Sequence, residues 1–168
     1  QEFNLFANQA QMDLFEQYFY DINQFGRMHG NDTEFSDMLN ILNEKINIFE
    51  VTAAMTHAGA GLWTAPSNLY RIGTIIYNNI EVERINKNEF LYINAAPLTK
   101  PTDARPVFVA DSTGYKVYGT ALLTSGVTCN YIKRPATAQW AGTLVDGSSL
   151  QSSANSVDFE LHDSEETE

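Results

Sequence analysis

Cys129 and the three histidines, His29, His57 and His162, are the residues of this sequence with the most versatile chemistry. A thiol nucleophile needs a histidine near it in space, and a helical metal site needs two histidines at i and i+4. No pair of these histidines has that spacing. Cys129 alternates with polar neighbours in a run typical of a strand, which indicates a buried, small apolar side chain. We therefore expect no catalytic residue, no metal site and no cofactor.

Paired carboxylates and aromatic side chains are the other groups that could act on a substrate. Glu81 and Glu83 alternate along a predicted strand, so both carboxylates point to one face. Glycosidases use carboxylate pairs, although exposed acids on a strand are common in other proteins. Trp63 and Trp140 could stack against sugars, although aromatic residues in short strands more often lie in a core or a protein interface. We predict that the protein is not an enzyme.

The composition indicates a folded, acidic chain. Its 168 residues are 43% apolar, which is enough for a core, and they carry a formal charge of -11. This charge argues against a dedicated nucleic-acid binder and against stable docking on an anionic membrane, because both require Lys and Arg. No run of about 18 apolar residues is present, so we predict no membrane span. The first residues lack the basic stretch of a signal peptide.

Two helices are expected over residues 3–25 and 32–49, joined as a hairpin that occupies residues 1–50. The second helix has good N-caps in Asp32 and Thr33. In the first helix, apolar side chains recur every three or four positions and predict one apolar face. That face comprises Phe3, Phe6, Ala10, Leu14, Tyr18, Ile22 and Phe25. So apolar a face must be covered, either by its own domain or by a neighbouring subunit.

The rest of the chain is predicted to be a linker or arm over 51–68, a β-rich region over 69–162 and an acidic tail over 163–168. The predicted strands are Leu69–Tyr77, Ile80–Ile85, Glu89–Ile93, Arg105–Ala110, Lys116–Tyr118, Val127–Lys133 and Ser156–Leu161. Asn78 and Asn79 predict a tight hairpin turn, and Asp163 with Glu166 predicts the start of a third helix. The fold class is therefore α+β: an N-terminal helical hairpin, a mainly antiparallel β region and a truncated C-terminal helix start.

Two surface features could mediate contacts between subunits. Residues 95–106 hold three prolines, so they predict a stiff, extended segment that is either an ordered loop covering a sheet edge or an arm that docks on another subunit. Lys133 and Arg134 form a dense positive pair on an acidic chain, which indicates either electrostatic pairing with another copy or a solvated strand end. The residues that we expect at subunit contacts are Pro97, Leu98, Pro101, Lys133 and Arg134.

Five segments, in this order, resemble a structural protein of crAss-like bacteriophages. They are EFNLFANQAQMDLFEQYF, SNLYRIGTI, EFLYINAAPLTKPTDARPVFV, VTCNYIKRPATAQW and SVDFELHDSEE. That family forms a ring in the neck or tail, below the portal, of short-tailed phages of gut Bacteroidetes. Its members extend further before the first helix and continue past the acidic segment into a helix. The resemblance therefore leads us to expect further residues at both ends.

The resemblance implies a non-enzymatic virion protein, a ring-forming head-tail connector or tail-barrel component that links the portal to the tail. Its implied partners are further copies of itself, in a dodecamer that matches the portal, together with the portal and other neck or tail ring proteins. DNA would pass through the lumen only transiently, and no membrane is involved. The protein would be assembled in the cytoplasm of the bacterial host and would reside in the virion. Two alternatives stay open: a carbohydrate-binding β module of a tail fibre or spike, and a small hydrolase using Cys129 or a carboxylate pair.

Overall fold

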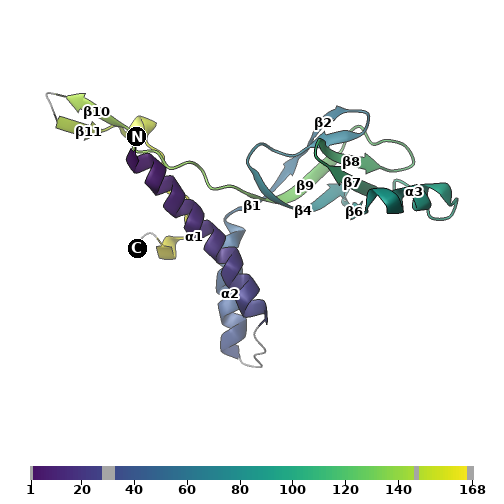
Figure 1. Cartoon of the computed structure of the whole chain (residues 1–168), viewed down its shortest axis with the longest axis horizontal. Helices are drawn as coiled ribbons and strands as arrows, with labels where there is room; N and C mark the ends of the chain where they lie inside the picture. Colours follow the sequence, from purple (N-terminus) through teal and green to yellow (C-terminus); the bar gives the residue numbers. More distant parts are fainter. Residues whose placement is uncertain (1, 28–32, 146–147, 166–168) are drawn as a thin grey trace. The chain divides into compact units, whose positions relative to one another are not determined.

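The computed structural model describes residues 2–27, 33–145 and 148–165. The chain forms two compact units (Figure 1). Unit 1 combines Gln1–Phe49 with Arg134–Glu168, and unit 2 is the continuous segment Glu50–Lys133. Helices and mainly antiparallel strands are both present, so the predicted α+β class is confirmed.

Unit 1 is built on the expected pair of helices, α1 (Glu2–Arg27) and α2 (Thr33–Asn47). Phe15 of α1 is fully buried and packs edge-to-face against Phe49, with 4.9 Å between the ring centroids. Tyr18 and Leu42 are also buried, so the two helices share an apolar interior. Asp32, expected as a cap, and the side chain of Phe25 lie outside the described residues.

The apolar face predicted for the first helix is wrong in its N-terminal half. Phe3 and Phe6 are more than 60% exposed, whereas the side chains that face the interior are Gln11, Phe15 and Tyr18. The physical reason is that this half of α1 packs against the backbone of another chain segment. The N–H and C=O groups of that backbone need hydrogen-bond partners, which polar side chains supply. The apolar residues of this half therefore remain accessible.

The C-terminal part of unit 1 holds an antiparallel hairpin, β10 (Gly142–Val145) with β11 (Ser148–Gln151), which the sequence did not reveal. The short 3₁₀ turns η1 (Ser153–Asn155) and η2 (Asp163–Glu165) follow it. The strand expected over Ser156–Leu161 is wrong, because only Val157 makes a bridge, to Gln139. At the expected helix start the structure has the single turn η2, and Glu166 lies outside the described residues.

Unit 2 consists of nine strands and one helix, and all of its residues are described. The strands are β1 (Glu50–Ala54), β2 (Thr56–Gly59), β3 (Leu62–Thr64), β4 (Leu69–Tyr77), β5 (Ile80–Glu81), β6 (Glu83–Arg84), β7 (Val107–Asp111), β8 (Gly114–Tyr118) and β9 (Val127–Lys133). The helix is α3 (Lys87–Ala95). One sheet has the order β1-β9-β4-β5 and the other the order β2-β3-β8-β7-β6.

The two sheets of unit 2 close into a small barrel. β1 continues into β2 after one residue, Met55, and β5 continues into β6 after one residue, Val82. Both of these side chains are buried, so each strand bends across the core and belongs to both sheets. The strand pairings therefore form a closed ring, in which β6 and β7 are parallel and the other pairs are antiparallel. Closure leaves few unpaired strand edges.

The core of the barrel comes from both sheets. It contains Met55, Trp63, Ile75, Val82, Phe108, Val117, Leu123, Val127, Cys129 and Tyr131. Along β9, buried and less buried residues alternate, with Val127, Cys129 and Tyr131 facing inward. The inference that Cys129 is a buried apolar side chain is confirmed.

Two local predictions in unit 2 are corrected. Residues 51–68, expected to be a linker, form β1, β2 and β3, because even small side chains fill the space on the inner face of a narrow barrel. The strand expected over Glu89–Ile93 is helical, because Phe90 and Ile93, three residues apart, are the pair that packs inward. The turn at Asn78 and Asn79 is confirmed, with both residues at positive φ between β4 and β5.

Candidate protein-interaction surfaces

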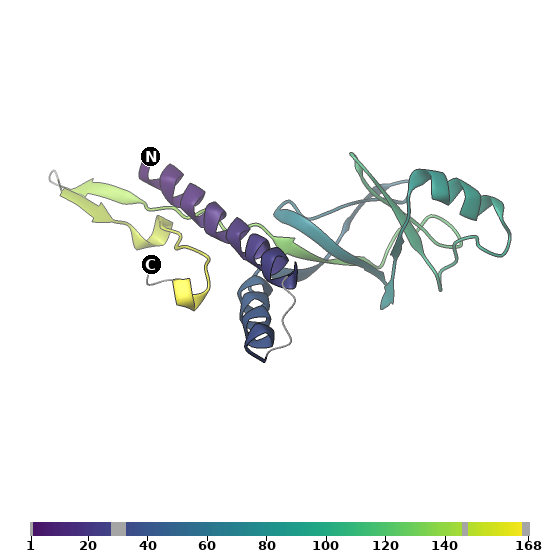
Figure 2. The ribbon, with the colours of Figure 1, turned by 60° about the horizontal axis from the view of Figure 1, so that its bottom comes forward.

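Helix α3 is held on the outside of the barrel by one side only (Figure 2). Phe90 stacks on Tyr118 with 4.1 Å between ring centroids, and Phe90 and Ile93 cover Val107 and Val109. Burial against these apolar groups stabilises a short helix that would be marginal in isolation. The packing also fixes which residues of α3 point outward.

The outward side of α3 and the loop after it present three large apolar side chains, which we call the α3 patch. Leu91 is 67% exposed, Tyr92 79% and Leu98 98%. Exposure of apolar area costs about 25 cal/mol for each Å² that could be buried. Three large, exposed apolar side chains within eight residues of the chain favour a contact site over isolated surface residues.

The proline-containing segment after α3 folds into two turns, so the stiff, extended conformation predicted for it is wrong, while its docking on another subunit stays a prediction. The N–H groups of Thr99 and Lys100 donate to the carbonyl of Ala96, which folds the chain back on itself. Thr102 and Arg105 then pair across a second tight turn. Proline restricts φ but is as compatible with turns as with extended chain.

A side-chain contact fastens this loop to the barrel. The N–H of Thr120 donates to Oδ1 of Asp103 at 2.8 Å, and the N–H of Asp103 donates to Oγ1 of Thr120 at 3.3 Å. The loop also lines a hollow beside β6, to which Glu83 and Leu98 contribute. The loop thus lies beside β6 and leaves Glu83 exposed.

The structure separates the five residues expected at subunit contacts. Pro97 and Leu98 are exposed and remain available for contact, whereas Pro101 is buried and supports its own loop. Lys133 ends β9 in unit 2 and is partly buried, and Arg134 is exposed at the point where the chain returns to unit 1. A role of Lys133 and Arg134 in pairing with another copy stays a prediction.

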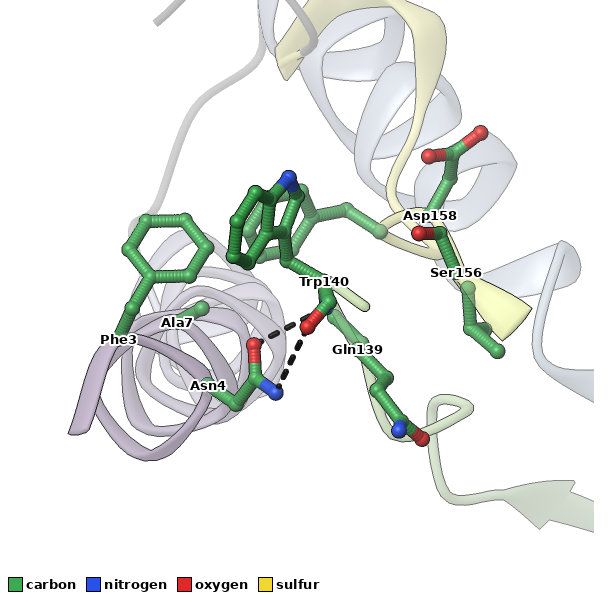
Figure 3. Close-up of a pocket in the computed structure, with 10 residues that line it drawn as sticks. Phe3, Asn4, Ala7, Gln139, Trp140, Ser156 and Asp158 are labelled. Atoms are coloured by element: carbon green, nitrogen blue, oxygen red, sulfur yellow. Dashed lines mark hydrogen bonds between the residues drawn. The ribbon is translucent and has the colours of Figure 1, made fainter. Parts of the chain in front are cut away.

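In unit 1, a row of amide side chains on α1 binds an extended segment of the chain. Asn4 exchanges two hydrogen bonds with the backbone of Trp140, 3.0 and 3.2 Å long (Figure 3). Asn8 donates to the carbonyl of Ala138 at 2.8 Å, and Gln11 donates to the carbonyl of Ala136. The helix therefore supplies the hydrogen bonds that a neighbouring strand would give.

Sequence reasoning missed this row of amides. Its signal is the i, i+4, i+7 spacing of Asn4, Asn8 and Gln11, which places the three side chains on one helix face. The apolar residues of the same helix also recur every three or four positions and predict a different face.

A groove runs along the adjacent face of α1, and we call it the α1 groove. It consists of two hollows, of about 140 Å³ and about 560 Å³, which share Asp158 and Phe159. The remaining lining residues are Phe3, Asn4, Ala7, Ala10, Gln11, Leu14, Ala138, Gln139, Trp140, Ser156, Val157, Leu161 and Glu165. Figure 3 shows Phe3 and Ala7 of α1 on the side where the Trp140 ring lies. Phe3, Trp140 and Phe159 are each about half exposed or more.

The wall of the α1 groove that contains Glu165 is bound to α2. Glu165 forms an ion pair with Lys45, whose ammonium lies 5.5 Å from the centre of the Tyr18 ring. Burial raises the pKa of the Tyr18 hydroxyl, and the negative charge of Glu165 raises it further. These contacts fix the position of the turn η2 at one end of the groove.

Two of the side chains with possible roles in catalysis or sugar binding, Cys129 and Trp63, lie in the core of the barrel. Cys129 is fully buried and burial raises the pKa of its thiol, so it is neither accessible nor activated as a nucleophile. Trp63 is buried, donates to the carbonyl of Leu123 and cannot stack on a sugar. Glu81 and Glu83 are both exposed on either side of buried Val82, as expected. Trp140 is exposed, within the α1 groove.

Within the part of the chain that the structure describes, no group of three or more His, Cys, Asp or Glu side chains is arranged to hold a metal ion. Among the same residues, no helix has both the length and the apolar character needed to cross a membrane. Neither a scan against protein-family models nor a search of curated proteins finds a match to this chain.

Proposed function

We propose that the protein is a ring-forming structural component of a bacteriophage virion, a head-tail connector or tail-barrel protein that links the portal to the tail and lets DNA pass. The observation that carries this proposal is the pair of unlike apolar surfaces on one chain, the α3 patch on unit 2 and the α1 groove on unit 1. Its function is assembly rather than catalysis. The resemblance of five segments to a crAss-like phage ring protein supplies the type of assembly.

Two unlike surfaces are what a ring of identical subunits requires. In a cyclic ring, one patch of each copy binds a different patch of the next copy. A two-fold dimer, by contrast, needs only one self-complementary patch. The α3 patch lies on a helix and its following loop, whereas the α1 groove is hollow. A chain with both can add copies repeatedly.

The charge of the chain is compatible with a DNA conduit. A formal charge of -11 repels phosphates, so DNA would pass through a lumen lined by such subunits without binding tightly to it. On this proposal the partners are further copies of the chain, the portal and the neighbouring neck or tail rings. The protein resides in the neck or tail of the virion after assembly in the bacterial cytoplasm.

The experiment that tests the proposal is native mass spectrometry of the purified protein, alone and mixed with the portal protein of the same phage, followed by electron microscopy. We expect a closed ring with a copy number that matches the portal's symmetry, either alone or on the portal. A protein that stays monomeric at all concentrations and does not bind portal would refute the proposal. Glycan-array binding by that monomer would instead support the carbohydrate-binding alternative.

A further inference from the structure

The two units of the chain differ sharply in charge. Unit 1 contains 3 Lys and Arg residues and 15 Asp and Glu residues, a formal charge of -12. Unit 2 contains 7 Lys and Arg residues and 6 Asp and Glu residues, a formal charge of +1. The acidity of the protein therefore belongs almost entirely to unit 1, and electrostatic attraction is available between unlike units of different copies.

The α3 patch lies in the more basic unit and has cationic side chains next to it. Lys100 and Arg105, both exposed, line a hollow of about 290 Å³ together with Leu98, and Glu83 contributes one acid to the same hollow. Lys87 at the start of α3 is mostly exposed and lies 3.7 Å from Asp111. Exposed Glu89 lies on α3 itself, so a partner of this patch should be apolar and should present acids on the Leu98 side, toward Lys100 and Arg105.

The α1 groove has these properties. Its lining includes Phe3, Trp140 and Phe159, and exposed Asp158 borders both of its hollows. No Lys or Arg occurs among the described residues that line it. The unit around it carries the charge of -12. The groove and the α3 patch thus both expose apolar side chains, and the acidic unit around the groove complements Lys100 and Arg105 beside Leu98.

We infer that the α3 patch of one copy docks into the α1 groove of the next copy, and that this head-to-tail contact is the one that builds the ring. The inference rests on the proposed function and specifies its partner surface. Leu91, Tyr92 and Leu98 lose their exposure to water in the contact, which supplies most of the affinity. Lys100 and Arg105 meet the acidic rim of the groove, which orients the incoming copy and speeds association.

Complementary variants of the full chain test this contact. The patch variant is Leu91→Ser with Leu98→Ser, and the groove variant is Phe3→Ser with Phe159→Ser. All four side chains are at least half exposed, so neither variant should disturb the fold. The matched control, Tyr20→Ser with Ile41→Ser, removes exposed apolar side chains of unit 1 outside both surfaces. Circular dichroism and thermal unfolding confirm that each variant is folded.

We expect each of the two test variants to weaken self-association by about 100-fold in dissociation constant, as for the loss of two apolar anchors, and the control to assemble like wild type. When the patch variant and the groove variant are mixed, one intact patch and one intact groove remain. The mixture should therefore form a 1:1 heterodimer that grows no further, detectable by native mass spectrometry. Added salt should weaken wild-type assembly, because the charges at the rim are screened.

The other outcomes refute the inference in distinguishable ways. If wild type and both variants form the same rings, the surfaces are wrong but the proposed function stands. If both variants are monomeric and their mixture forms no heterodimer, the contact is not head-to-tail between patch and groove. If wild type itself fails to assemble, alone and with portal, the proposed function fails together with the inference.

Discussion

Gln11 is a buried polar side chain in the middle of an amphipathic helix, and its position is explained by the backbone that it binds. Its Nε2 donates to the carbonyl of Ala136 at 2.7 Å, and its Oε1 accepts from the N–H of Glu160 at 3.1 Å. Glu160 in turn accepts from the N–H of Ala136 through its carboxylate at 2.8 Å. One glutamine therefore joins two chain segments that have no strand partner at this point.

Replacing Gln11 by Leu should destabilise unit 1. The substitution keeps the size of the side chain but leaves the carbonyl of Ala136 and the N–H of Glu160 without these partners, which costs about 1 to 3 kcal/mol. Urea unfolding followed by the helical circular dichroism signal measures the loss. Gln17→Leu, at an exposed position of the same helix, is the matched control and should change stability by less than about 0.5 kcal/mol. Equal stability of the two variants would contradict this role for Gln11.

The elements that the sequence predicted well are those with a long, regular pattern. β4 and β9 begin and end at the predicted residues, and α1 and α2 lie within two residues of their predicted bounds. A pattern that persists over four or more helical turns, or over four or more alternations of apolar and polar residues, leaves little room to assign another type of secondary structure. Short elements do not have this advantage. In α3, Phe90 is followed by apolar residues at both i+2 and i+3, so the pattern fits a strand and a helix equally well.

The candidate surfaces were only partly predictable for a related reason. Leu98 was identified from its neighbouring prolines, because that signal is local in the sequence. The α1 groove was not predicted, because its lining combines α1 with two segments that lie more than 100 residues further along the chain. Pro101 has the same local signal as Pro97, yet Pro101 is buried and Pro97 is not. Tertiary contacts, rather than residue type, decide which proline a partner can reach.

At the level of the hairpin between β4 and β5, the turn residue Asn79 should control stability through its backbone angle. Asn79 has φ of +64°, in the left-handed region that glycine adopts without strain. Asn79→Gly should therefore preserve or slightly raise stability, whereas Asn79→Val should lower it by about 1 to 2 kcal/mol. Thermal unfolding of both variants measures the difference. A valine variant as stable as the glycine variant would show that the turn does not require this angle.

On the scale of the whole molecule, unit 2 has the organisation of an inserted module. It is one continuous segment with its own core, while unit 1 is assembled from the chain on both sides of it. The first residue of β1, Glu50, pairs with Ile132 near the end of β9. The chain therefore enters and leaves the barrel at neighbouring positions, as it must if the barrel is to interrupt unit 1 without disturbing it.

The residues Glu50–Lys133, expressed alone, should therefore fold. Trp63 is the tryptophan of this segment and is buried, so its emission should be blue-shifted and should move to longer wavelength in a single cooperative unfolding transition. The control begins at Thr56 and lacks β1, which removes the strand that pairs with β9 and opens the barrel. This shorter segment should show the red-shifted emission of an exposed tryptophan. If Glu50–Lys133 is itself unfolded, the barrel depends on unit 1, and the ring would have to be assembled from subunits that fold as a whole.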